Sequence, residues 1–121
     1  MKSYYTFQKK DDHLYMTISG EYDFHDFKLY LDIIRDKCEE DKIYKVLFDA
    51  MKVEGIDIPS MERYFLGIGA AELSKYKIKT AVVWHKDYTN YIFETVAVNR
   101  GGNVKIFGNA EPAVMWLLFD N

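Results

Sequence analysis

Short runs of β-branched and aromatic residues alternate with longer amphipathic stretches along most of this sequence. The first two runs, residues 3–10 and 13–20, flank the polar pair Asp11 and Asp12, which predicts a β-hairpin. Helical and strand-like patterns then alternate along the sequence up to residue 119. We expect helices at 23–41, 58–76, 88–100 and 110–119, and strands at 43–51, 78–84 and 103–107.

The order of these elements, β-β-α-β-α-β-α-β-α, constrains the fold strongly. Strands separated by helices form parallel crossovers, whereas a hairpin places its two strands antiparallel. We therefore predict an α/β fold with a central, mostly parallel five-stranded sheet and an N-terminal antiparallel hairpin. The 121 residues suit a single domain over 1–121, since no Pro-, Ser- or Gly-rich stretch separates two parts.

Periodicity also predicts which faces are buried. Leu14, Met16 and Ile18 alternate with polar residues, which is typical of a strand with one covered face. In the helix at 23–41 the apolar stripe, including a buried and unreactive cysteine, consists of Phe24, Phe27, Leu31, Ile34 and Cys38. In the helix at 58–76 the predicted core stripe consists of Met61, Tyr64, Phe65, Ile68 and Ala71. The small residues of that helix predict close packing against strands, and they are Gly67, Gly69, Ala70 and Ala71.

The composition argues against several classes of protein. Hydrophobic residues make up 49% of the chain and charged residues 29%, as in soluble globular proteins. The net charge of -3 argues against a nucleic-acid partner, which would require clustered Lys and Arg. The single cysteine cannot form an intrachain disulfide, the N-terminus lacks the apolar core of a signal peptide, and the longest apolar run, 113–119, is too short to span a bilayer. We therefore expect a cytoplasmic protein with no integral membrane segment.

Residues 99–103 have the most unusual local sequence, Asn-Arg-Gly-Gly-Asn, between a helical pattern and a short strand. Gly101 or Gly102 supplies the left-handed residue that ends a helix, and Arg100 places a cation near the negative end of the helix dipole. We interpret the segment as a helix stop. A ligand contact in addition stays open, whereas a lone Arg-Gly-Gly is weak support for RNA binding.

With this order of elements, the sequence resembles the SpoIIAA-like family, relatives of the anti-sigma-factor antagonist (STAS) domain. The resemblance covers nearly the whole length. It rests on the N-terminal hairpin, on VLFDAMKVEGIDIPS at 46–60, and on the ending ETVAVNRGGNVKIFGNAEPAVMWL at 94–117, which looks like a bacterial subgroup. It implies a central sheet wound with helices as a βα superhelix, and a regulatory module that binds a protein partner.

In the phosphoregulated antagonists of this family, an Asp is followed by a phosphorylatable Ser at the start of the second helix. Asp49 and Asp57 are spaced like the family's strand-end acid and loop Asp, but Ile58 and Pro59 follow Asp57. The nearest hydroxyl is that of Ser60, displaced by two positions. The resemblance therefore implies phosphorylation-controlled binding only through Ser60. The other interpretation is a first-turn Ser that satisfies a backbone donor.

Ligands of open α/β sheets gather at the carboxyl ends of the parallel strands. There we expect a ligand or partner rim that consists of Asp49, Asp57, Ser60, Trp84, His85 and Asn109. Asp49 and His85 would make an acid–base pair if neighbouring strands place them together. However, the sequence has no nucleophile elbow, no metal-ligand spacing and no phosphate-binding glycine motif. We therefore predict no enzyme activity, no metal and no cofactor.

Two further predictions concern contacts between elements. A polar cluster linking the helices at 58–76 and 88–100 is expected to consist of Arg63, Glu94, Asn99 and Arg100. The second face of the sheet carries Lys45, Leu47, Lys79, Ala81, Val83, Lys105 and Phe107. Either a helix covers this half-apolar face, or the face is exposed as a homodimer or partner interface.

These observations favour a non-catalytic regulatory or protein-interaction module that associates with itself as a homodimer. The alternative is a carrier or sensor of a small apolar ligand or lipid. Such a pocket would be lined by the aromatic and Met-rich helices, with Met61, Tyr64, Phe65, Tyr91, Phe93, Met115 and Trp116, unless these side chains form the core. Cavity volume distinguishes the two, because a ligand site needs about 300 Å³ or more whereas a packed core leaves almost none.

Overall fold

The computed structural model describes residues 1–86 and 91–119. In chain order it contains β1 (Ser3–Lys9), β2 (Leu14–Glu21), α1 (Phe24–Asp41), β3 (Lys45–Glu54), α2 (Ser60–Glu72), the 3₁₀ segment η1 (Leu73–Tyr76), β4 (Lys79–Val83), α3 (Ile92–Asn99), β5 (Val104–Phe107) and α4 (Ala110–Phe119). This is the predicted order, with η1 forming the end of the helix predicted at 58–76. Residues 88–90 of the helix predicted at 88–100 lie outside the described residues.

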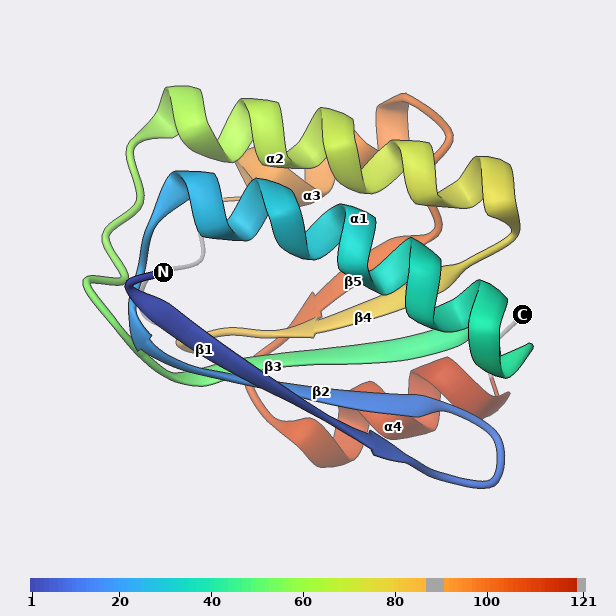
Figure 1. Cartoon of the computed structure of the whole chain (residues 1–121). Coiled ribbons are helices and arrows are strands. Elements are labelled where there is room, and N and C mark those ends of the chain that lie inside the picture. The colour runs from blue at the N-terminus through green and yellow to red at the C-terminus, as the bar shows by residue number, and fades with distance from the viewer. Residues whose placement is uncertain (87–90, 120–121) are drawn as a thin grey trace.

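The strands form one sheet in the order β1-β2-β3-β4-β5. β1 and β2 pair antiparallel, and each further pair of neighbours from β2 to β5 is parallel. Figure 1 shows α1, α2 and α3 on one face of the sheet and α4 on the other. The predicted α/β fold, with its mostly parallel five-stranded sheet and N-terminal hairpin, is confirmed.

The larger core lies between the sheet and the layer of α1, α2 and α3. Leu14, Met16 and Ile18 of β2 are fully buried in it, as their alternation predicts. The helix α1 contributes the buried apolar side chains of Phe27, Tyr30, Ile34 and Cys38. The predicted stripe of this helix is therefore right at three of its five positions, while Phe24 and Leu31 are half-buried and Tyr30 is an addition.

A buried carboxylate joins the start of β1 to α1. Oδ2 of Asp26 accepts hydrogen bonds from the backbone N–H of Lys2 (3.0 Å), the backbone N–H of Ser3 (2.9 Å) and the hydroxyl of Ser3 (2.8 Å). The Ser3 hydroxyl also lies 2.5 Å from the hydroxyl of Tyr30. Burial alone would raise the pKa of Asp26, but these bonds outweigh it, and the pKa lies below its ordinary value.

The second face of the sheet is covered within the chain by α4. Leu47, Ala81 and Val83 of the sheet pack against Ala113 and Leu117 of this helix in a separate small core. The sequence left two alternatives for this face, cover by a helix or exposure as an interface. Over β3 and β4 the face is covered by a helix.

Lys79 anchors the carboxyl end of α4. Its Nζ donates to the backbone oxygen of Trp116 (2.7 Å) and lies 4.4 Å from the centre of the Trp116 ring. A cation is stabilised there both by the negative end of the helix dipole and by the face of the indole. The lysine thus has a structural role in fixing the helix that covers the sheet.

The prediction for α2 is wrong in its orientation. Met61, Tyr64 and Phe65, three residues of the predicted core stripe, are 65%, 38% and 49% exposed. The face that packs inward consists of Arg63, Leu66, Gly67, Ala70 and Ala71. Of the predicted stripe only Ala71 is buried, and Ile68 is half-buried.

Small residues explain this orientation, because they let α2 approach α3 closely. A Cβ on Gly67 would lie 2.7 Å from the backbone oxygen of Phe93 and 3.0 Å from Cβ of Val96. A Cβ on Gly69 would instead meet the side chain of Leu31 in α1. Gly67 and Gly69 therefore serve contacts with neighbouring helices and not the predicted contacts with strands. Ala70 packs in a small core with Ala97 of α3 and Val104 of β5, so close packing against a strand is correct for Ala70.

The helix stop predicted at residues 99–103 is confirmed. Gly101 has a φ of +87° and its N–H donates to the backbone oxygen of Val98 (2.9 Å). The N–H of Gly102 donates to the backbone oxygen of Ala97 (2.8 Å). This pair of bonds is the Schellman arrangement, which satisfies carbonyls at the end of α3 and turns the chain toward β5.

Cys38 has the buried position that the sequence predicts. Its side chain is fully buried, and burial raises the pKa of the thiol to about 12. At pH 8 we expect its reaction with a water-soluble disulfide reagent to be slower than that of an ordinary exposed thiol on the order of a thousandfold, because the thiolate is the nucleophile. Absorbance of the released thiolate measures the rate. Unfolding in urea should restore full reactivity, and fast reaction of the native protein would contradict the buried assignment.

Candidate functional site

Asp49 is the last residue of β3 that pairs with β4, and its carboxylate is hydrogen-bonded to other residues of the sheet. Its Oδ2 accepts a hydrogen bond from the hydroxyl of Tyr15 (2.6 Å), and its Oδ1 accepts one from the backbone N–H of Met51 (3.1 Å). Burial, and then the bond to Asp49, raises the pKa of Tyr15 to about 12. Tyr15 is therefore a neutral donor at physiological pH, and Asp49 acts as a structural acceptor that joins β2 to β3.

The other predicted rim residues differ in exposure. Trp84 is buried directly after β4, and the half-buried His85 follows it with its ring 6.0 Å away. The exposed members are Asp57 in the loop before α2, Ser60 at the first residue of α2 and Asn109 just before α4. Across residues 1–86 and 91–119, no group of three or more His, Cys, Asp or Glu side chains is placed to hold a metal ion. A binding role of the rim remains a prediction.

The loop between β3 and α2 is held by the first turn of α2. Nε of Arg63 donates to the backbone oxygen of Ile58 (2.8 Å), and Arg63 is buried. Glu62 accepts a hydrogen bond from the hydroxyl of Tyr22 (2.8 Å), which lies between β2 and α1. Burial lowers the pKa of Arg63 and the nearby Asp57 partly offsets this effect. The start of α2 is thus fixed to the loop that precedes it and to the β2–α1 turn.

The four residues predicted as a polar cluster have contacts in different places. Arg63 binds the loop before α2, whereas Glu94 accepts a hydrogen bond from the backbone N–H of Ile106 in β5 (3.1 Å). Nη2 of Arg100 donates to the hydroxyl of Tyr64 (3.3 Å), which links the end of α3 to α2. Asn99 is exposed. The expected α2–α3 link is thus made by Arg100 and Tyr64.

The outward side of α2 presents an apolar stripe, which we call the α2 outer face and define as Met61, Tyr64 and Phe65. The rings of Tyr64 and Phe65 lie 5.6 Å apart, and the ring of Phe24 from α1 lies 6.5 Å from Phe65. Cations border it, since Lys28 lies 4.8 Å from the centre of the Phe24 ring and Arg100 lies beside Tyr64. The α2 outer face is thus an exposed surface of aromatic and methionine side chains with cations at its border.

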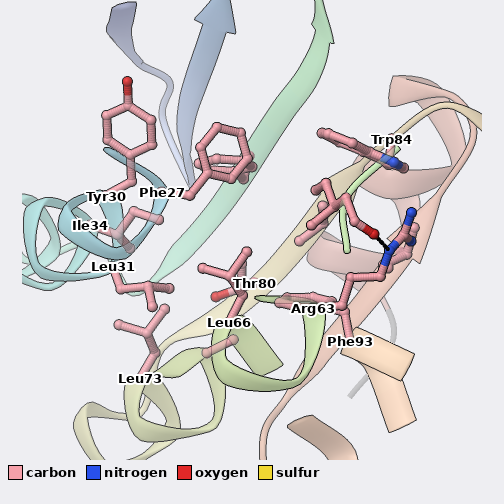
Figure 2. A pocket seen from close by; sticks show the side chains of 15 residues that line it. Phe27, Tyr30, Leu31, Ile34, Arg63, Leu66, Leu73, Thr80, Trp84 and Phe93 are labelled. Atoms are coloured by element: carbon pink, nitrogen blue, oxygen red, sulfur yellow. Dashed lines mark hydrogen bonds between the residues drawn. The ribbon is translucent and has the colours of Figure 1, made fainter. Parts of the chain in front are cut away.

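A cavity lies behind α2, on the inward side of the same helix (Figure 2). It has a volume of about 80 Å³ and lies between α1, α2, α3 and the sheet. Its lining is apolar apart from a few groups, among them Arg63, Thr80 and Trp84. The hydroxyl of Thr80 and the indole nitrogen of Trp84 are buried and have no hydrogen-bond partner within the described residues.

This cavity bears on the ligand-carrier alternative. Its volume of about 80 Å³ is well below the roughly 300 Å³ of an ordinary ligand site, so a bulky lipid has no preformed room. Of the aromatic and methionine residues predicted to line such a pocket, Phe93 does so. Trp116 packs under the opposite face of the sheet, and the exposed remainder are Met61, Tyr64, Phe65, Tyr91 and Met115.

The unpartnered hydroxyl gives a prediction about stability. Replacing Thr80 by valine should raise the free energy of unfolding by about 1 kcal/mol, because it removes a buried polar group without creating a cavity. Urea unfolding followed by circular dichroism measures the change. Thr17→Val is the matched control: Thr17 is a half-buried β2 residue whose change should be near zero. A loss of stability in Thr80→Val would show that the hydroxyl has a partner.

No profile of a known protein family matches the sequence, and no curated protein matches it. Solved structures do match. An anti-sigma factor antagonist from Mycobacterium paratuberculosis has a TM-score of 0.64 to this chain at 16% sequence identity, over 95% of this chain and 93% of its own. An uncharacterised protein with a SpoIIAA-like fold from Shewanella loihica PV-4 has a TM-score of 0.55 at 15% identity, with the same two shares of 95% and 93%. At such identities the likeness establishes the fold, and the predicted SpoIIAA-like fold is confirmed.

In the described parts of the chain, no helix has both the length and the apolar character needed to cross a bilayer. The cytoplasmic location expected from the sequence stays a prediction.

Proposed function

We propose that this chain is a non-catalytic regulatory module that binds another protein through the α2 outer face. The observation that carries the proposal is the exposure of Met61, Tyr64 and Phe65 at 65%, 38% and 49% on a helix whose other side is the one that packs inward. An apolar stripe on a surface helix normally faces the core. Its outward orientation here favours a partner that covers it.

The residue types also support a protein partner. Tyr, Phe, Met and Arg are enriched at the centres of protein interfaces, and the α2 outer face with neighbouring Arg100 consists of these types. The start of α2 is held by the bonds of Arg63 and Glu62, so the surface is formed before a partner arrives. A preformed surface loses little conformational entropy on binding.

The fold supports a regulatory role. One protein with this fold is an anti-sigma factor antagonist, and we infer that the chain described here likewise acts by binding rather than by catalysis. Ser60 is exposed and directly precedes Met61, so a phosphate on it would place negative charge beside the α2 outer face. Regulation through Ser60 is a part of this proposal.

We further propose that a second copy of the chain is one partner, with the two α2 helices packed against each other. A twofold axis would then bring Phe65 of each copy into an apolar contact between the helices. In sedimentation velocity experiments we expect the purified protein to shift from monomer to dimer as its concentration rises to about 100 μM, the range of weak interfaces.

The variant Met61→Ser/Phe65→Ser should remain monomeric over the same range. The matched control is Met115→Ser/Phe119→Ser, which removes exposed apolar side chains of α4 on the other side of the sheet and should dimerise like the wild type. A wild-type monomer throughout would refute self-association. If Met61→Ser/Phe65→Ser still dimerises, the dimer contact does not involve the α2 outer face.

A further inference from the structure

The cavity behind α2 follows one face of β4 and its continuation. Thr80, Val82 and Trp84 all line it, because side chains two residues apart point to the same side of a strand. At about 3.3 Å per residue, the row from Thr80 to Trp84 extends over about 13 Å. The cavity therefore has two ends, which differ in chemistry.

The Trp84 end offers an unused hydrogen-bond donor. Trp84 is 5% exposed, and its indole nitrogen has no partner within the described residues. An indole N–H can only donate, so an acceptor oxygen is the group that would satisfy it. Leaving a donor unsatisfied in an apolar environment is destabilising, which favours any ligand that supplies the acceptor.

Arg63 adds positive charge to this end of the cavity. Its guanidinium and the indole nitrogen of Trp84 lie on the same side of the view in Figure 2, away from Tyr30 and Ile34. The topology agrees with the picture, since Trp84 directly follows β4 and Arg63 lies in the first turn of α2, the helix that follows the neighbouring strand β3. The other end is formed by apolar side chains of α1 and η1, among them Ile34 and Leu73.

We propose that the cavity binds a short aliphatic molecule that carries one oxygen acceptor, with the oxygen at Nε1 of Trp84 and the aliphatic part toward Ile34. The volume of about 80 Å³ is about half that of a 150 Å³ cavity that accommodates benzene, so the part enclosed has roughly three to four non-hydrogen atoms. Ligands of this size bind with dissociation constants of about 0.1 to 10 mM. This site is separate from the partner surface, which lies on the outer side of α2.

The two tryptophans allow a direct test by nuclear magnetic resonance. The indole N–H of Trp84 reports on the cavity, whereas that of Trp116 lies on the other side of the sheet and serves as an internal control. Acetone and acetate are the probes, since each has four non-hydrogen atoms and an acceptor oxygen. 2-Methylpropene is the matched probe without an acceptor, because it has the shape of acetone with CH₂ in place of the oxygen.

Titration with acetone or acetate should move the Trp84 indole resonance downfield to a plateau and leave Trp116 unchanged. If acetate binds more tightly, the ligands of the cavity are carboxylates that use the charge of Arg63. If acetone binds more tightly, they are neutral carbonyl compounds. Trp84→Phe assigns the resonance. Val82→Ile, which adds one carbon to the cavity wall, should weaken binding about tenfold or more while the spectrum remains that of a folded protein.

Two results would overturn the proposal. One is a Trp84 resonance that neither acetone nor acetate moves at 100 mM, about ten times the weakest expected dissociation constant. The other is an equal downfield shift with 2-methylpropene, because the oxygen would then have no role. If Val82→Ile does not fold, Thr80→Val serves as the second cavity variant, since it changes the lining without enlarging it and should retain the Trp84 shift.

Discussion

Replacing Asp26 by asparagine should lower the free energy of unfolding by about 3 kcal/mol at pH 7. Oδ2 of the carboxylate accepts three hydrogen bonds from Lys2 and Ser3. The oxygen of an amide can take this place, but it lacks the negative charge that makes hydrogen bonds to a carboxylate about twice as strong. Urea unfolding measures the loss. Ser3→Ala is the smaller comparison, because it keeps the charge of Asp26 and removes one of the three bonds together with the contact to the Tyr30 hydroxyl. It should cost about 1 to 2 kcal/mol.

The effect of Asp26 should depend on pH in a defined direction. Its pKa is lower in the folded protein than its ordinary value, so its contribution is fully present above the unfolded pKa of about 3.9. It is lost as the pH falls through the folded value. The difference between wild type and Asp26→Asn should therefore shrink below about pH 4. A difference that stays constant down to pH 2 would show that the charge of Asp26 is not what stabilises the contact.

Replacing Gly67 by alanine should cost about 2 kcal/mol of unfolding free energy, although alanine is the better helix former. The added Cβ would lie 2.7 Å from the backbone oxygen of Phe93 and 3.0 Å from Cβ of Val96. Neither atom can rotate away, so α2 and α3 must move apart. Thermal or urea unfolding of the purified variant measures the change.

Gly69→Ala is the matched control, two residues further along the same helix. There the added Cβ would meet the end of the Leu31 side chain, which can change its rotamer. The gain in helix propensity of about 1 kcal/mol should offset this contact, and the net change should be near zero. Equal losses of unfolding free energy in the two variants would contradict the conclusion that Gly67 is needed for the close approach of α2 and α3.

The features that were predictable from the sequence follow from regular patterns. Alternation in β2 identified Leu14, Met16 and Ile18 as buried, and they are. The order of elements was sufficient to predict a mostly parallel sheet with an antiparallel hairpin, because strands separated by helices form parallel crossovers. The glycines after α3 predicted its end, since Gly101 adopts a positive φ that other residues avoid.

The orientation of α2 was not predictable from periodicity. A hydrophobic stripe identifies the most apolar face of a helix, which in α2 is the face with Met61, Tyr64 and Phe65. Close packing instead selected the face with Gly67 and Ala70, because small side chains allow the backbones of α2 and α3 to approach. The signal present in the sequence is the density of small residues in α2, which indicates close packing but does not distinguish a helix from a strand as the neighbour.

The cavity was not predictable for a different reason. Thr80, Val82 and Trp84 share one face of a strand, and the alternation of the sequence indicates that much. A cavity, however, is a local deficit of packed volume between several elements. The cavity depends on the position of α2. A sequence prediction that places the wrong face of α2 inward therefore cannot include it.

The two proposed sites are on opposite sides of one helix. Arg63 and Leu66 line the cavity, whereas Met61, Tyr64 and Phe65 form the α2 outer face. A ligand that moves α2 would therefore have a physical route to the partner surface. The two sites are nevertheless separable by experiment, because Val82→Ile changes the cavity alone and Met61→Ser/Phe65→Ser changes the outer face alone.

Native mass spectrometry of the protein isolated from its own cells tests the central claim most directly. We expect the wild-type chain to carry a second protein chain, identical or different, that is absent from Met61→Ser/Phe65→Ser and retained by Met115→Ser/Phe119→Ser. A bare monomer, or a partner retained equally by both variants, would contradict the assignment of the α2 outer face as the surface through which this protein acts.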